Sequence, residues 1–139
     1  HETMRVTAVL EDYLEAIYNL SRSTGGARSR DIAGALGVHK STVTSALKSL
    51  GQMGLVHYFP YEAVSLTIEG EKVAGDVVRR HETLRRFFTD VLRVDPEMAE
   101  KAACGMEHSM PREIVDRLAQ FAGKYQDETG KKRKNAKCG

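Results

Sequence analysis

Apolar residues recur at helical spacing along most of the chain, and the first such stretch lies close to the N-terminus. They fall on one face of an amphipathic helix that ends at the turn Thr24-Gly25-Gly26. The apolar stripe of this helix contains Val9, Leu10, Tyr13, Leu14, Ile17 and Tyr18. The pattern predicts a mainly helical protein whose first helix packs one side against a core.

Two further helices are predicted close together after this turn. Ser29 is a favourable N-cap for a short helix, and Gly37 suits the left-handed residue that ends it. The next helix begins near His39, with an apolar stripe that runs from Val43 to Leu50. Two helices joined by a few residues around a glycine are typical of a helix-turn-helix.

The outer face of the second of these helices carries short hydroxyl side chains between two lysines, and no acid. Short polar side chains let a helix enter the major groove of DNA, and lysines can contact phosphates. An ordinary solvated helix face is the alternative, but such faces usually carry acids. The residues expected to bind DNA are Lys40, Ser41, Thr42, Thr44, Ser45 and Lys48.

Two short alternating stretches follow, at residues 55–59 and 64–67, with a turn over 60–63. They predict a β-hairpin. A hairpin directly after a recognition helix is the wing of a winged helix, so the expected N-terminal domain is a winged helix-turn-helix over residues 5–70.

The second half of the chain is predicted to be helical, with a long helix capped by Thr67, another capped by Asp95 with Pro96 at its first position, and a last one opened by Pro111. This gives a helical domain over residues 71–125 and a basic, disordered tail over 126–139. The stripe of the long helix is too apolar to stay exposed, which favours a homodimer. Its members are Val77, His81, Leu84, Phe88 and Val91.

Composition changes this picture little. The chain has 139 residues, 41% of them hydrophobic and 29% charged, which is ordinary for a soluble globular protein. No apolar run is long enough to span a membrane and no signal peptide is visible, so a cytoplasmic protein is expected, without a membrane partner. A formal net charge of +2 argues only weakly for nucleic acid.

Most of the candidate metal-binding side chains lie on the predicted fifth helix. Cys104, Glu107 and His108 stand at i, i+3 and i+4, and Glu100 lies one turn earlier. A thiolate, a carboxylate and an imidazole on one face suit a transition metal. The alternative is a buried cysteine beside surface residues. His81, inside an apolar stripe, is either a hydrogen-bonded core residue or a further ligand.

The first helix also carries two acids, Asp12 and Glu15, at i and i+3. Such a pair is usually a solvated face. Asp12, however, adjoins the apolar stripe at Tyr13, so an inward orientation stays open.

From Val9 to Tyr125, the chain resembles the family of metal-dependent transcriptional repressors that includes the diphtheria toxin repressor and the manganese transport regulator. The pieces that carry the resemblance are Glu11–Tyr18, Asp31–Val38, Ser41–Thr44, Leu66–Gly70, Arg79–Glu82 and Ala103–His108. The resemblance implies a repressor that binds operator DNA as a dimer through its helical domain when Mn²⁺ or Fe²⁺ is bound, and that controls metal-uptake genes. Zn²⁺, Co²⁺ or Cd²⁺ are expected substitutes.

The metal ligands that the resemblance implies are Asp12, Glu15, His81, Cys104, Glu107 and His108. This set is a hybrid, because Asp12 matches the manganese branch of the family and Cys104 the iron branch. An ancillary site of the iron branch has a carboxylate where this chain has Arg85, although Glu100 fits another of its positions. Because the iron branch continues into a further domain beyond the point that this sequence reaches, the resemblance leads us to expect the short, two-domain form.

Two other functions are compatible with parts of the sequence. Residues 104–108 loosely resemble a zinc peptidase helix, but a winged helix offers no obvious cleft, so no enzyme is expected. The other alternative is a redox- or ligand-sensing winged-helix regulator in which Cys104 is a reactive thiol. Thiol titration with and without metal would separate these functions, because a ligating thiolate is protected.

Overall fold

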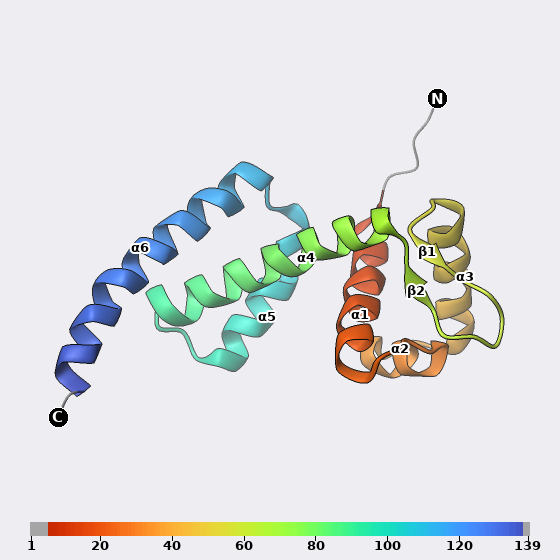
Figure 1. Cartoon of the computed structure of the whole chain (residues 1–139), viewed down its shortest axis with the longest axis horizontal. Coiled ribbons are helices and arrows are strands. Elements are labelled where there is room, and N and C mark those ends of the chain that lie inside the picture. Colours follow the sequence, from red (N-terminus) through yellow and green to blue (C-terminus); the bar gives the residue numbers. More distant parts are fainter. Residues whose placement is uncertain (1–5, 138–139) are drawn as a thin grey trace. The chain divides into compact units, whose positions relative to one another are not determined.

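The computed structural model describes the backbone of residues 6–137 and the side chains of residues 6–125. The chain divides into two compact units, unit 1 over His1–Val78 and unit 2 over Arg79–Gly139 (Figure 1). The prediction of a mainly helical fold is confirmed. In chain order the elements are α1 (Ala8–Thr24), α2 (Ser29–Leu36), α3 (Lys40–Gln52), β1 (Val56–His57), β2 (Ser65–Leu66), α4 (Ile68–Arg86), the π-helix η1 (Phe87–Val91), α5 (Pro96–Met106), the 3-10 helix η2 (Glu107–Ser109) and α6 (Arg112–Lys137). Among the residues that the structure describes, no helix is both long and apolar enough to cross a bilayer.

The core of unit 1 is apolar and joins α1, α2, α3 and the hairpin. Its fully buried side chains include Leu14, Ile17, Ile32, Val43, Leu47 and Leu50. The helical spacing of α1 therefore predicted its core face, except at Val9, which is 62% exposed. Val9 is the second residue of the helix, and Val6 and Leu10 on either side of it are the residues that pack against the core.

The helix-turn-helix forms as predicted, with one correction at its start. Gly37 ends α2 in the left-handed conformation, with φ 67°. Ser29 is not the N-cap of α2, because it is already helical and the extended residue before it is Arg28. The carbonyl oxygen of Arg28 accepts the first helical hydrogen bond from the backbone N–H of Ile32, at 3.0 Å.

The wing is shorter than predicted. β1 and β2 pair antiparallel with Val56 opposite Leu66, and Val64 forms a separate bridge with Ala27. The residues between the strands make a loop in which Tyr61 is fully exposed and has a φ of 67°. Pairing between the strands ends at His57 and Ser65, and the N–H of Val64 instead donates to the carbonyl oxygen of Ala27, at 2.7 Å.

The start of α4 is fixed tightly to the end of α3. Thr67 caps the helix as predicted, because its hydroxyl accepts from the N–H of Gly70 at 2.9 Å and donates to the carbonyl of Gly54 at 2.7 Å. A Cβ at position 70 would lie 1.9 Å from the carbonyl oxygen of Leu55. Only glycine permits this approach.

Unit 2 contains the end of α4 together with η1, α5, η2 and α6. Asp95 caps α5 through its carboxylate, which accepts from the N–H of Glu97 at 3.1 Å, as predicted. The ring of Phe87 lies 6.2 Å from that of Phe121, so α6 packs against η1. The buried apolar side chains of this unit are Leu84, Ala99, Ala103 and Val115.

The last helix differs from the prediction at both ends. It begins at Arg112 rather than at Pro111, and it continues to Lys137, where a disordered tail after residue 125 was expected. Residues 126–137 contain no proline and are rich in lysine, which favours helix. Cys138 lies outside the described residues.

Candidate nucleic-acid interface and metal centre

The surface of α3 is divided cleanly into two faces. Val43, Ala46, Leu47 and Leu50 are buried in unit 1. Of the six residues expected to face DNA, only Thr44 is half-buried; the exposed ones are Lys40, Ser41, Thr42, Ser45 and Lys48. The hydroxyl of Thr44 donates to the carbonyl oxygen of Lys40 at 3.1 Å. The exposed face therefore carries two cations and several hydroxyls, and no acid opposes an approaching phosphate.

A hollow lies beside this face and was not predicted from the sequence. Its walls come from the beginnings of α2 and α3 and from the wing; its lining residues are Arg28, Ser29, Arg30, Lys40, Thr44, Tyr58, Pro60, Tyr61 and Glu62. Three cations against one acid give it a positive character. The pair Arg28 and Arg30 next to a helix-turn-helix was the available signal in the sequence. That Tyr61 lines the hollow could not be predicted, because its position depends on the path of the wing loop and no local sequence pattern specifies that path.

His81 is the centre of the polar cluster in unit 2, and its side chain is only 10% exposed. Its Nδ1 lies 2.5 Å from Oε1 of Glu107, and its Nε2 lies 2.9 Å from Oε2 of Glu100. The hydrogen bond to Glu107 raises the pKa of His81 to about 9, burial opposes this shift, and Glu100 adds to it. Without a metal, the ring is therefore protonated at neutral pH, and it donates one N–H to Glu107 and the other to Glu100.

Glu107 is 1% exposed, which is unusual for a carboxylate. Its Oε2 accepts no hydrogen bond among the described residues and lies 3.5 Å from Nε2 of His108. A buried carboxylate oxygen of this kind is costly unless a cation or donor compensates it. The arrangement fits a metal ligand.

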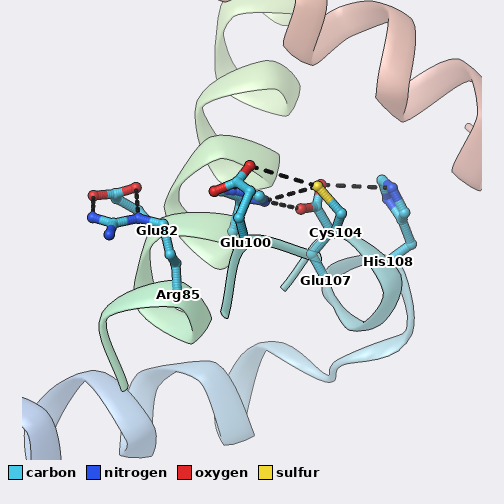
Figure 2. Close-up of polar contacts among 7 residues, drawn as sticks. Glu82, Arg85, Glu100, Cys104, Glu107 and His108 are labelled. Carbon is cyan, nitrogen blue, oxygen red and sulfur yellow. Dashed lines mark hydrogen bonds and ion pairs between the residues drawn. The ribbon is translucent and has the colours of Figure 1, made fainter. Parts of the chain in front are cut away.

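Cys104 completes the cluster from the exposed side. Its Sγ lies 3.8 Å from Nδ1 of His81 and 3.8 Å from Oε2 of Glu100. His81, Glu100 and Cys104 each offer one ligand atom, and these atoms lie within 4.8 Å of one another. Figure 2 shows Glu100, Cys104, Glu107 and His108 gathered at this place.

The helical register that predicted this grouping needs one correction. Glu107 and His108 do not belong to α5, because the chain tightens there into the 3-10 helix η2. The four side chains still come from one continuous stretch of backbone, which is why their spacing in the sequence was informative.

Asp12 and Glu15 lie on α1 in unit 1, where Asp12 is exposed and Glu15 is half-buried. Their assignment as metal ligands stays a prediction from the sequence. Both are titratable oxygen donors of the kind that manganese prefers.

Arg85 does not face the metal cluster. Its guanidinium donates two hydrogen bonds to the carboxylate of Glu82, at 3.1 and 2.6 Å, and these lower the pKa of Glu82 (Figure 2). A guanidinium cannot bind a cation. An ancillary site that needs a carboxylate at position 85 therefore does not fit this chain.

Two family models match nearly the whole chain. Residues 5–64 match the N-terminal DNA-binding domain of iron-dependent repressors, and residues 67–133 match their metal-binding and dimerisation domain. The division between the two matches falls at β2, just before α4 begins.

Curated relatives include a transcriptional regulator MntR of Escherichia coli O157:H7, which is 42% identical over 117 residues, 84% of this chain and 75% of the relative. MntR of Bacillus subtilis strain 168 is 34% identical over 127 residues, 91% of this chain and 89% of the relative.

Solved structures agree in fold. IdeR of T. acidophilum has a TM-score of 0.73 at 27% identity, covering 81% of this chain and 53% of that one. A manganese-dependent transcriptional repressor in complex with manganese has a TM-score of 0.76 at 28% identity, covering 82% of this chain and 52% of that one. The chain thus spans about half the length of these two structures.

Proposed function

The chain belongs to the iron-dependent repressor family of metal-dependent transcriptional regulators, and we propose that it is a homodimeric repressor that binds operator DNA when Mn²⁺ or Fe²⁺ is bound. The observation that carries the proposal is the cluster around His81 and Glu107, where two buried ionisable groups meet an exposed thiol and a further carboxylate. A manganese-dependent transcriptional repressor of similar fold has been solved in complex with manganese, and ScaR has been solved with Zn²⁺ and with Cd²⁺.

The proposed ligands are His81, Cys104, Glu107 and His108 of unit 2, together with Asp12 and Glu15 of unit 1. The assignment of the unit 2 residues as ligands is supported by the short distances between their side chains. The assignment of Asp12 and Glu15 is supported by the sequence resemblance. A bound divalent ion supplies positive charge to carboxylates, a thiolate and an imidazole, which are the donors that transition metals take. Because ligands from two units serve one ion in this proposal, binding favours the arrangement of the chain that is competent for DNA.

At the DNA, Ser41, Thr42, Thr44 and Ser45 would face base edges, while Lys40 and Lys48 would contact phosphates. The acid-free face of α3 supports this assignment. In a dimer, two such helices must lie about 34 Å apart to enter successive major grooves. Control of metal-uptake genes is part of the same proposal.

The decisive experiment selects duplexes from a random library with Mn²⁺ present and then measures their affinity by fluorescence anisotropy in Mn²⁺, in Fe²⁺ under anaerobic conditions, and in chelator. We expect binding to tighten roughly 5–150-fold with metal. Equal affinity in chelator and in metal would contradict the proposal.

Two substitutions test the hybrid ligand set in the same assay. Asp12→Met removes a hard oxygen donor and should reduce activation by Mn²⁺ more than by Fe²⁺. Cys104→Glu replaces a soft donor and should do the reverse. Circular dichroism checks that both variants fold. If both keep wild-type activation by both metals, neither residue is a ligand.

A further inference from the structure

The hollow between the beginnings of α2 and α3 and the wing is large enough to hold a small molecule. Its volume is about 580 Å³, and pockets that bind small ligands measure roughly 300–1,000 Å³. Three separate elements of unit 1 supply its walls, so the hollow exists only in the folded domain. The side chains around it that can bind a ligand include three cations, two tyrosines and one carboxylate.

The three cations of the hollow are available to a ligand. Arg28, Arg30 and Lys40 are exposed, and among the described residues none of their side chains forms an ion pair or a hydrogen bond. The helices α2 and α3 both begin at the hollow without a side-chain cap, which leaves backbone N–H groups of their first turns to donate to another acceptor. Guanidinium groups and helix N-termini are common partners of phosphate. This wall of the hollow therefore suits a ligand with more than one phosphate.

The wing supplies groups that phosphate alone does not need. Tyr58 is half-buried and Tyr61 is fully exposed, and both line the hollow. The backbone of Tyr61 is left-handed, with φ 67°, and strained residues of this kind cluster at ligand-binding positions. Aromatic side chains of this type stack on nucleobases of any sequence. Glu62 follows in the chain, and its carboxylate can accept hydrogen bonds from the hydroxyls of a sugar.

We propose that this hollow is a binding site for a nucleotide with more than one phosphate, such as a nucleoside diphosphate. The cations hold the phosphates, the tyrosines stack on the base, and Glu62 accepts from the ribose hydroxyls. Lys40 and Thr44 line the hollow and also belong to the face of α3 assigned to DNA, so a bound nucleotide and DNA exclude each other. This exclusion rests on the proposed function, whereas nucleotide binding does not.

The first experiment titrates the full chain, in chelator and without DNA, with ADP, with adenosine and with inorganic pyrophosphate. Isothermal titration calorimetry gives the three dissociation constants. We expect ADP to bind at least about tenfold more tightly than either fragment, because adenosine lacks the phosphates and pyrophosphate lacks the base. No binding of ADP, or equal affinity for ADP and pyrophosphate, would overturn the nucleotide site.

Three variants test where ADP binds. Arg30→Ala should raise the Kd for ADP at least about tenfold, because it removes a charged hydrogen-bond donor. Tyr61→Gly removes the ring and relieves the left-handed backbone, so it should unfold no more easily than the wild type. It should still raise the Kd for ADP about tenfold and leave pyrophosphate binding unchanged. Arg117→Ala, an exposed position on α6, is the matched control and should bind ADP as the wild type does. Wild-type affinity for ADP in both variants of the hollow would overturn the assignment.

The second experiment measures competition with DNA by fluorescence anisotropy, at a constant concentration of free Mn²⁺. Saturating ADP should weaken duplex binding by the wild type at least about tenfold, while Tyr61→Gly at the same ADP concentration should keep its own ADP-free affinity. Unchanged DNA affinity of the wild type in saturating ADP would overturn the exclusion. DNA binding that does not respond to metal, with the ADP titrations as expected, would contradict the proposed function alone.

Discussion

The two units differ in where their candidate functional side chains lie relative to the core. The core of unit 1 is built from apolar side chains, and its candidate DNA-binding residues lie on the outside of α3. Unit 2 has few fully buried apolar side chains and encloses two ionisable residues among those described, His81 and Glu107. In unit 1, folding and function can therefore be changed separately. In unit 2 the same residues serve both.

The largest effect is expected from Gly70→Ala, which tests unit 1 far from its DNA-binding face. The new methyl group would meet the Leu55 carbonyl oxygen at 1.9 Å, so the start of α4 must shift. We expect the free energy of unfolding to fall by about 3 kcal/mol or more, measured by urea denaturation. Gly75→Ala is the control: it has open space around it and should stabilise α4 by up to about 1 kcal/mol. Equal stability of the two variants would contradict the close approach.

The second-largest effect is expected in the free energy of unfolding of the metal-free protein, which should depend on pH through His81. The pKa of His81 is raised from its ordinary 6.5 to about 9, so the folded state holds this proton more tightly than the unfolded state. The stability gained is fully present below pH 6.5 and is lost as the pH rises through 9. The loss should amount to roughly 3 kcal/mol at most between these limits. Urea denaturation across this range measures it, and a Glu107→Gln variant should show a clearly flatter profile. An identical profile in that variant would remove Glu107 as the main cause.

The third prediction concerns Glu107→Gln in the metal-free protein at neutral pH. Removing one partner of a buried ion pair costs roughly 3–5 kcal/mol. Glu100 still contacts His81 and the amide oxygen can accept the same hydrogen bond, so we expect about 2 kcal/mol. Glu113→Gln breaks an exposed pair with Arg117 and should cost no more than about 0.5 kcal/mol. If both variants were equally stable, the buried pair of His81 and Glu107 would contribute no more to the stability of unit 2 than an exposed ion pair does.

The smallest effect is expected from Lys48→Glu on α3. It should leave the stability of unit 1 within about 0.5 kcal/mol of wild type, because the residue is exposed. It should weaken metal-dependent DNA binding about tenfold for all sequences alike and reduce the salt dependence by about one phosphate contact. Lys72→Glu, exposed on α4, is the control. Unchanged affinity at low salt would remove Lys48 from the interface.

Local patterns predicted the features of the fold that depend on neighbours in the chain. The caps Thr67 and Asp95 and the left-handed Gly37 follow from short-range hydrogen bonding and sterics. The π-helix η1 and the short pairing of the wing could not be predicted, because they depend on how distant segments pack.

In the candidate metal site, too, some features could be predicted from the sequence and others could not. The i, i+3, i+4 spacing of Cys104, Glu107 and His108 predicted that these residues would gather. The burial of Glu107, and which ring nitrogen of His81 faces which carboxylate, depend on packing between α4 and α5 and on rotamers. Spacing along the chain does not specify either.

The left-handed backbone at Tyr61 has an evolutionary consequence. A tyrosine at a φ of 67° lowers the stability of the folded state by of order 1–2 kcal/mol relative to glycine. Its ring is fully exposed, so burial of the ring does not offset this cost. Selection for stability alone would therefore favour glycine at this position. A tyrosine maintained there would be under selection for something other than folding, at the tip of the wing.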